Sequence, residues 1–142
     1  MELSGICQSF ASAYAYLCLQ CGIDAVPTSG MTEDYVCHEW ALIELDGNYY
    51  YVDPTYENGN GGKGLQYFGI TSDQRQSVDG YITEYDNIGN TNTIWGKDID
   101  ISNKRFANLW DIVYVKELLR QDGKLYIYGQ KADGTEDKII IE

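Results

Sequence analysis

One histidine, His38, is the only imidazole in the chain, and it stands between two residues with which it could do chemistry. Cys7 precedes it and Asp53 follows it. A thiolate is a strong nucleophile, and an imidazole whose ring is fixed by a carboxylate can remove the thiol proton and later return it. These three residues therefore predict nucleophilic chemistry on a carbonyl group, in which any imidazole base must be His38.

The segment that carries Cys7 has the pattern of a helix from Ser4 to about Leu19. Ser4 is a plausible N-cap, and Gly22 stands where a helix commonly ends. Cys7 then lies in the first turn, where the helix dipole stabilises an anion by about 0.3–1 kcal/mol. Apolar residues at three- and four-residue spacing predict the buried face of this helix, namely Phe10, Tyr14, Leu17, Cys18 and Cys21.

The segment that carries His38 and Asp53 predicts a β-hairpin. Two strands, Val36–Leu45 and Asn48–Asp53, flank the turn dipeptide Asp46-Gly47. A two-residue turn pairs Leu45 with Asn48 and places His38 and Asp53 on the same face, as diagonal neighbours roughly 7–8 Å apart at the backbone. A three-residue turn without a bulge would place them on opposite faces.

The rest of the chain predicts short strands separated by polar turns. Thr28–Asp34 is expected to be a turn, residues 57–64 a flexible glycine-rich loop without a phosphate-binding ending, and residues 79–105 a polar loop. Ser72-Asp73 is expected to cap a short helical turn. The expected further strands are Ile23–Thr28, Leu65–Ile70, Ile112–Val115, Leu125–Tyr128 and Lys138–Ile141, the last two joined as a hairpin.

Four short motifs in this order resemble the transglutaminase-like superfamily, especially its bacterial members. They are Gly5-Ile6-Cys7-Gln8, His38 at the start of a strand, Gly47-Asn48-Tyr49-Tyr50, and Val52-Asp53-Pro54-Thr55, and the resemblance covers residues 4–56. It implies Cys7 as nucleophile, His38 as general acid and base, and Asp53 as the carboxylate that orients the imidazole. Beside them, Gln8 and Trp40 are expected to form part of the site wall or contact the substrate.

The expected fold class is α+β, with a nucleophile helix packed on an antiparallel sheet in the style of papain-like and transglutaminase-like cysteine enzymes. Residues 1–105 would form this core, and residues 106–142 a C-terminal β extension packed on the same domain. The expected activity is acyl transfer on amide bonds through a Cys7 thioester, most simply hydrolysis of a peptide or protein substrate. An amine acceptor would instead make the protein a crosslinking transglutaminase.

A second interpretation is a non-catalytic binding or assembly module on the same scaffold. Members of the superfamily usually carry helices before the nucleophile, and this sequence has none there. The surface left by that segment would favour a homodimer. The sequence shows no signal peptide, so it is either a complete cytoplasmic protein or, as we favour, a piece of a longer, secreted or cell-surface bacterial protein.

Composition narrows the partners. With 22 acidic and 10 basic residues, the net charge of −12 argues against nucleic acid. No apolar run is long enough for a membrane span. No cofactor is expected, and no metal, because Cys37 and His38 are neighbours on a strand and point to opposite faces. Cys18, Cys21 and Cys37 are instead expected to be buried thiols, without a disulfide framework.

Overall fold

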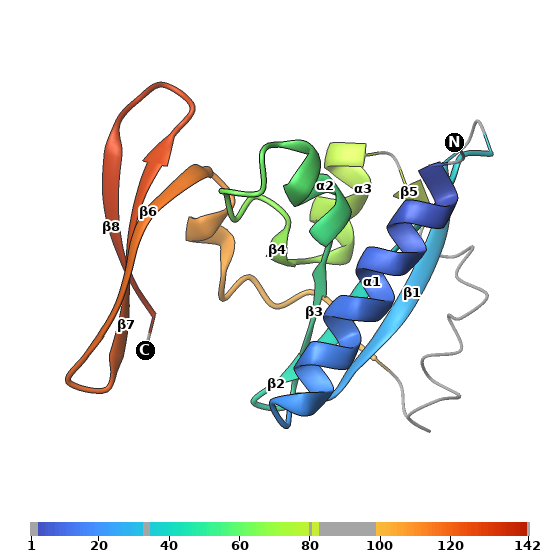
Figure 1. Ribbon diagram of the computed structural model, residues 1–142, viewed down its shortest axis with the longest axis horizontal. Coiled ribbons are helices and arrows are strands. Elements are labelled where there is room, and N and C mark those ends of the chain that lie inside the picture. The colour runs from blue at the N-terminus through green and yellow to red at the C-terminus, as the bar shows by residue number, and fades with distance from the viewer. Residues whose placement is uncertain (1–2, 33–34, 80, 83–98, 142) are drawn as a thin grey trace.

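The computed structural model describes residues 3–32, 35–79, 81–82 and 99–141, and it contains two antiparallel sheets (Figure 1). The first has the strand order β4-β3-β2-β1-β5 and the second the order β6-β7-β8. The strands of the first sheet are β1 (Ala25–Thr32), β2 (Cys37–Leu45), β3 (Asn48–Val52), β4 (Phe68–Ile70) and β5 (Tyr81–Ile82). Those of the second are β6 (Ile112–Gln121), β7 (Lys124–Lys131) and β8 (Glu136–Ile141).

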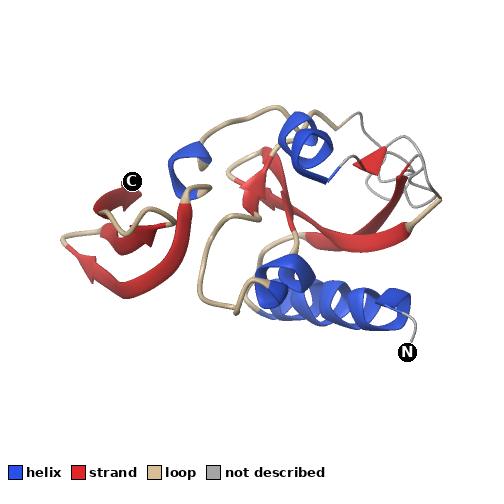
Figure 2. Ribbon diagram, turned by 90° about the horizontal axis from the view of Figure 1, so that it is seen from above, coloured by secondary structure: helices blue, strands red, loops and turns tan. Residues whose placement is uncertain are grey.

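Helices cover both faces of the five-stranded sheet. The helix α1 (Leu3–Gln20) packs against β1 and β2, and α2 (Pro54–Gly59) lies beside it. The helix α3 (Ser72–Asp79) lies on the opposite face, and a 3₁₀ turn at Ala107–Leu109 leads into the second sheet (Figure 2). This arrangement confirms the α+β class with a C-terminal set of β-strands. In the described part of the chain, none of the helices has the length and hydrophobicity of a membrane span.

The predicted hairpin is confirmed at its turn. Asp46 and Gly47 have φ values of 52° and 77°, as a two-residue turn between twisted strands requires. Leu45 pairs with Asn48, and the same register continues to the pair of Ala41 with Val52. The side chains of β2 therefore alternate between the two faces as the sequence predicts.

The polar turn predicted over Thr28–Asp34 is wrong for residues 28–32, and residues 33–34 lie outside the described residues. The strand β1 continues through Thr32, and Thr28, Ser29 and Gly30 pair with Trp40, Glu39 and His38. Pairing with a long neighbour thus overrides the local turn preference of these residues.

The other differences concern loops and element lengths. A helix stands where the loop over residues 57–64 was expected to begin, the helix at Ser72 extends to Asp79, the strands β6 and β7 are longer than predicted, and β4 is shorter. The polar loop predicted over residues 79–105 contains the short strand β5, and its residues 80 and 83–98 lie outside the described residues.

The buried face of α1 is narrower than predicted. It consists of Cys7, Ala11, Ala15 and Cys18, each 9% exposed or less, whereas Leu17 is 61% exposed and Cys21 is exposed. Small side chains on this stripe let the helix backbone approach the sheet closely, so the larger residues turn outward. The expectation that Cys21 and Cys37 are buried is wrong, since both are exposed, while that of a buried Cys18 is confirmed.

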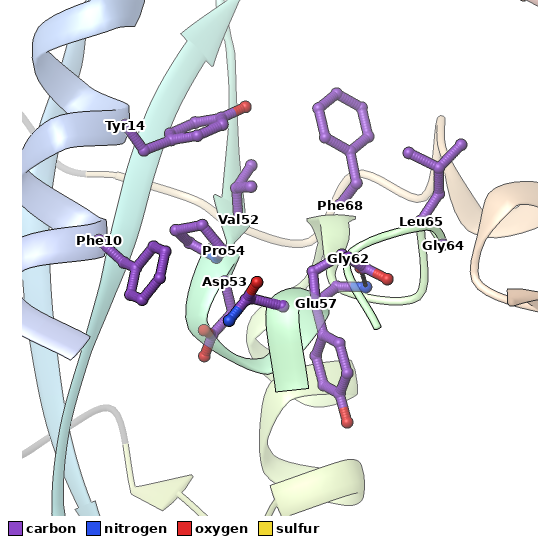
Figure 3. Close-up of a pocket in the computed structure, with 12 residues that line it drawn as sticks. Phe10, Tyr14, Val52, Asp53, Pro54, Glu57, Gly62, Gly64, Leu65 and Phe68 are labelled. Atoms are coloured by element: carbon purple, nitrogen blue, oxygen red, sulfur yellow. Dashed lines mark hydrogen bonds between the residues drawn. The ribbon is translucent and has the colours of Figure 1, made fainter. Parts of the chain in front are cut away.

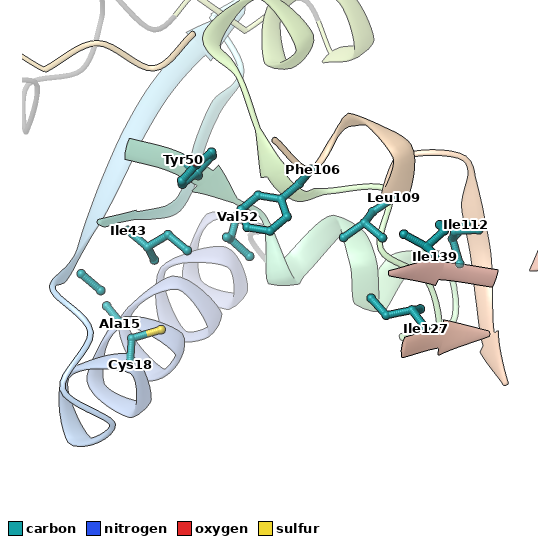
Figure 4. Close-up of a cluster of buried hydrophobic side chains, with 11 residues drawn as sticks. Ala15, Cys18, Ile43, Tyr50, Val52, Phe106, Leu109, Ile112, Ile127 and Ile139 are labelled. Atoms are coloured by element: carbon teal, nitrogen blue, oxygen red, sulfur yellow. The ribbon is translucent and has the colours of Figure 1, made fainter. Parts of the chain in front are cut away.

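One apolar cluster joins the two sheets (Figure 4). It runs from Ala15 and Cys18 on α1, through Ile43, Tyr50 and Val52 on the first sheet, to Phe106 and Leu109. It ends on the second sheet at Ile112, Ile127 and Ile139. The backbone adds to this connection, because the amide of Leu65 donates to the carbonyl of Ile112.

Gly69 in β4 is required by its backbone angle and by its neighbour. Its φ is 64°, and a Cβ there would lie 2.8 Å from Cγ of Phe106. The Phe106 ring is held in edge-on contacts with Tyr50 and Phe68, at centroid distances of 4.9 and 5.2 Å. Because the ring is packed on both sides, it cannot move aside for a methyl group.

Glu57 fastens the segment between α2 and β4. Its Oε2 accepts a hydrogen bond of 2.8 Å from the backbone amide of Tyr67. Burial raises the pKa of Glu57 above its ordinary value of 4.5, and this outweighs the lowering by hydrogen bonds from the Tyr67 and Gln66 amides. The folded chain therefore holds the Glu57 proton more tightly than the unfolded chain.

We expect Gly69→Ala to lower the free energy of unfolding by about 2–5 kcal/mol, because a left-handed alanine costs about 1–2 kcal/mol and overpacking about 1–3 kcal/mol. The matched control is Gly123→Ala, since Gly123 has a φ of 76° but open space around its Cβ position. The Gly123→Ala variant should lose only about 1–2 kcal/mol, which is the cost of a left-handed alanine. Urea unfolding of both variants checks this, and equal losses would show that the Phe106 contact is unimportant.

We expect Glu57→Gln to become more stable relative to the wild type as the pH rises from about 4.5 to 7. A raised folded-state pKa contributes stability at low pH that is lost as the pH rises through it, and glutamine cannot ionise. Urea unfolding at several pH values measures the difference. Asp133→Asn is the control: hydrogen bonds from Thr135 lower the pKa of Asp133 from 3.8, so its difference should stay constant over this range. A constant difference for Glu57→Gln too would contradict the prediction.

Candidate functional site

The imidazole of His38 and the carboxylate of Asp53 lie in direct contact. Their Nε2 and Oδ2 atoms are 2.6 Å apart, and the two residues are 5% and 0% exposed. An ionised carboxylate can only accept hydrogen bonds, so Nε2 carries the ring proton and donates a hydrogen bond to Oδ2 of Asp53. The ring nitrogen that would serve as a base is then Nδ1. The contact expected between these two residues is present, but Asp53 makes it from the start of α2 and not as a diagonal neighbour within the sheet.

Asp53 reaches His38 because it leaves the sheet. The strand β3 ends at Val52, and Asp53 is the N-cap of α2, with Pro54 fixing the first helical position. Its Oδ1 accepts a 3.0 Å hydrogen bond from the amide of Tyr56. Its own amide donates to the carbonyl of Tyr67. One carboxylate oxygen therefore caps a helix, and the other faces the imidazole.

Arg75 is a member of this cluster that the sequence analysis did not identify. It comes from α3, and Nη1 and Nη2 both donate to Oδ2 of Asp53, the first at 2.7 Å. The residue is 0% exposed, and its guanidinium carbon lies 4.1 Å from the ring centre of Trp40. The arginine thus supplies the opposite charge that a buried carboxylate needs.

Aromatic rings hold the imidazole from two sides. Tyr56 stacks on His38 with ring centres 4.6 Å apart and planes 10° apart, and Trp40 lies 5.8 Å away. Trp40 is fully buried, so it forms an inner wall of the cluster. Gln8, the other residue expected near the site, is exposed on α1.

Cys7 lies at the same end of the sheet as the His38–Asp53 pair. The N-terminal part of α1, the start of β2, and α2 and α3 gather there (Figure 1). Cys7 is 2% exposed, on the side of α1 that packs on the sheet. By alternation His38 shares a face with Trp40, which contacts Arg75 of α3 on the far side of the sheet from α1.

The sheet has a gap beside His38. The pairs between β3 and β2 stop at Val52 and Ala41, so the first residues of β2 have β1 as their only sheet neighbour among the described residues. The β1 residue opposite His38 is Gly30, which carries no side chain.

Glu39 adds a second carboxylate near the imidazole. It follows His38 on β2 and by alternation points to the opposite face. Burial raises the pKa of Glu39, and the charge of His38 acts in the opposite direction. The sequence analysis gave this residue no role.

A pocket of about 360 Å³ opens next to Asp53, between α1 and the segment that follows β3 (Figure 3). Its walls are mainly aromatic and aliphatic, with Phe10 and Tyr14 from α1 and Leu65 and Phe68 opposite. Phe10 is one helical turn from Cys7. The lining includes Asp53 and Glu57 but neither Cys7 nor His38. The volume is within the range of small-ligand sites.

The cysteines give no sign of a metal centre. Within the described ranges, no group of three His, Cys, Asp or Glu side chains is arranged to hold a metal ion. All four cysteines are free thiols, and Cys18 is buried while Cys37 is exposed. The hydroxyl of Tyr14 donates a hydrogen bond to the sulfur of Cys18, and burial raises the pKa of both groups.

The sequence could have indicated Arg75 only weakly. It is one of ten basic residues in an acidic chain and stands in a short polar helix with few apolar residues to bury. Its contact with Asp53 spans 22 residues and depends on where α3 packs.

Comparison with known proteins leaves the assignment to the geometry of this site. No protein-family model, curated protein or solved structure matches the chain.

Proposed function

We propose that the protein catalyses cysteine-dependent acyl transfer on amide bonds, with Cys7 as nucleophile, His38 as general acid and base, and Asp53 as the orienting carboxylate. Hydrolysis of a peptide or protein substrate is the reaction that needs the fewest further parts. The observation that carries the proposal is the buried contact between His38 and Asp53, at the end of the sheet near which α1 begins (Figure 1). The transglutaminase-like resemblance of residues 4–56 is consistent with it.

The reaction would proceed in two steps. The thiol of Cys7 gives its proton to Nδ1 of His38, and its sulfur attacks the substrate carbonyl carbon. The amide C–N bond then breaks, the imidazolium protonates the leaving amine, and a thioester remains. In the second step His38 removes a proton from water, the oxygen attacks the thioester, and the thiol leaves with its proton restored. A lysine amine in place of water would give a crosslink.

The local structure supports the role of each group. Asp53 fixes the tautomer in which Nε2 is protonated, so Nδ1 is the nitrogen that can serve as a base. Tyr56 stacks on the ring and restricts its rotation. The proposal requires the thiol of Cys7 to reach this ring around the end of β3, where the pairing with β2 stops at Val52.

A non-catalytic binding module is the second candidate, and two observations favour it. Cys7 is buried, whereas a nucleophile must be reached by its substrate. The pocket of about 360 Å³ borders Asp53 and has mainly apolar walls, but it is not lined by Cys7 or His38. In this case the His38–Asp53 contact would stabilise the walls of a binding site.

We expect iodoacetamide to label Cys7 faster than Cys21 and Cys37 at about pH 6, because a paired imidazolium maintains the thiolate where ordinary thiols are protonated. In His38→Ala this advantage should fall by at least tenfold. Mass spectrometry of the intact and digested protein across about pH 5–9 locates and times the modification.

The exposed thiols serve as internal controls, since Cys21 and Cys37 should keep their labelling profiles in the variant. Slow labelling of Cys7 in the wild type, unchanged by His38→Ala, would reject the enzyme and favour the binding module. Fast labelling followed by no cleavage of a peptide library, with or without added amines, would leave a reactive thiol without the proposed hydrolysis or crosslinking.

The homodimer also stays a prediction, and the outer side of α1 is where we expect it. Tyr16 and Leu17 are 60% and 61% exposed there, and no charged residue occurs in α1. The net charge of −12 opposes self-association, so an interface between two copies needs an uncharged apolar surface such as this one. Sedimentation velocity should show a dimer that Leu17→Glu dissociates, and a monomer in the wild type would contradict this.

A further inference from the structure

We infer that Arg75 is a positioning residue that sets both the orientation and the charge of the His38–Asp53 pair. Its effect on catalysis rests on the proposed function, whereas its effect on the His38–Asp53 pair does not. It is carried by the contacts themselves: Arg75 is 0% exposed and directs two N–H groups at the same Asp53 oxygen, Oδ2, that contacts His38.

The first effect of Arg75 is on geometry. Without a fixed partner for each oxygen, the carboxylate of Asp53 could turn about its side-chain torsions. Here Oδ1 is fixed by the Tyr56 amide and Oδ2 by the Arg75 guanidinium, so both oxygens are held from different elements. The direction from Oδ2 to the imidazole is therefore set by α3 as well as by α2.

The second effect is on charge. Asp53 with a neutral imidazole would be one uncompensated negative charge in a buried site, and this favours protonation of the ring. With Arg75 the pair is already neutral, so a protonated ring adds a net positive charge. Arg75 thus favours neutral His38, the state that acts as a general base, as long as Cys7 is a neutral thiol; a Cys7 thiolate would supply the negative charge that pairs with an imidazolium. Glu39 on β2 opposes this effect, whereas Tyr56 on α2 contributes an uncharged ring.

Trp40 extends the arrangement by one more step. The guanidinium lies over its ring at 4.1 Å and over that of Tyr56 at 5.3 Å. Arginine is planar and stacks well on aromatic faces while donating in its own plane, which lysine cannot do. The two residues that flank His38 therefore also hold the guanidinium that fixes its partner.

The test uses the fact that His38 is the only histidine, so its ring signals in an NMR spectrum need no separation from others. In the wild type, the ¹⁵N–¹H spectrum of the imidazole should show the tautomer protonated at Nε2. In Arg75→Gln, the pH midpoint of the ring signals should rise by about one unit or more, because the variant removes a positive charge that repels the imidazolium at close range. The tautomer signals should also become mixed.

Two further variants separate this role from a structural one. Arg105→Gln is the matched control, because Arg105 donates to Asp46 in an exposed ion pair at the hairpin turn, and it should leave both signals unchanged. Arg75→Lys keeps the charge but loses the planar fork. Its midpoint should stay within about 0.3 units of the wild type, whereas its tautomer signals become mixed.

The outcomes are decisive for Arg75 whether or not Cys7 is reactive. An unchanged midpoint and tautomer in a folded Arg75→Gln variant would overturn the inference and leave Arg75 a structural ion pair. If Arg75→Gln does not fold, Arg75→Lys decides: an upward midpoint shift of about one unit there would overturn it. A response of His38 to Arg75 together with an inert Cys7 would support this inference while rejecting the proposed enzyme.

Discussion

A carboxylate without solvent contact is the constraint on which this end of the molecule depends. Asp53 is fully buried, and burying a charge costs several kcal/mol unless hydrogen bonds and an opposite charge compensate for it. The compensation comes from three separate elements: the start of α2, the guanidinium of α3 and the imidazole of β2. Because each partner is on a different segment, satisfying this one group determines how those segments meet.

The same residue couples local structure to the candidate site. As N-cap of α2, Asp53 satisfies a backbone amide that the helix would otherwise leave unpaired. As N-cap, Asp53 has an extended backbone conformation, with φ and ψ of −114° and 90°. That conformation turns its second oxygen toward His38. One side-chain position thus makes both the cap of α2 and the contact with the imidazole. Substitutions of Asp53 therefore affect stability and chemistry together.

Features set by neighbouring residues could be predicted from the sequence, and features set by distant packing could not. The Asp46-Gly47 turn fixes the register of β2 and β3, and this register brings the start of β2 close to the end of β3, where His38 and Asp53 meet. The length of β1 was missed because Thr28 and Ser29 favour turns locally but pair with β2 in the fold. Arg75 was missed for the same reason, since its polar helix gives no sign of which residue it will bury.

The early end of β3 reconciles two demands that conflict in a regular sheet. One further pair, Trp40 with Asp53, would keep the residue after Val52 in the sheet, where its backbone could not begin α2. Instead Asp53 leaves the strand and caps α2, and its amide donates to the carbonyl of Tyr67, so the backbone group remains satisfied. The proposed chemistry of Cys7 depends on the same strand end, because its thiol would have to reach His38 where the pairing of β3 with β2 has stopped.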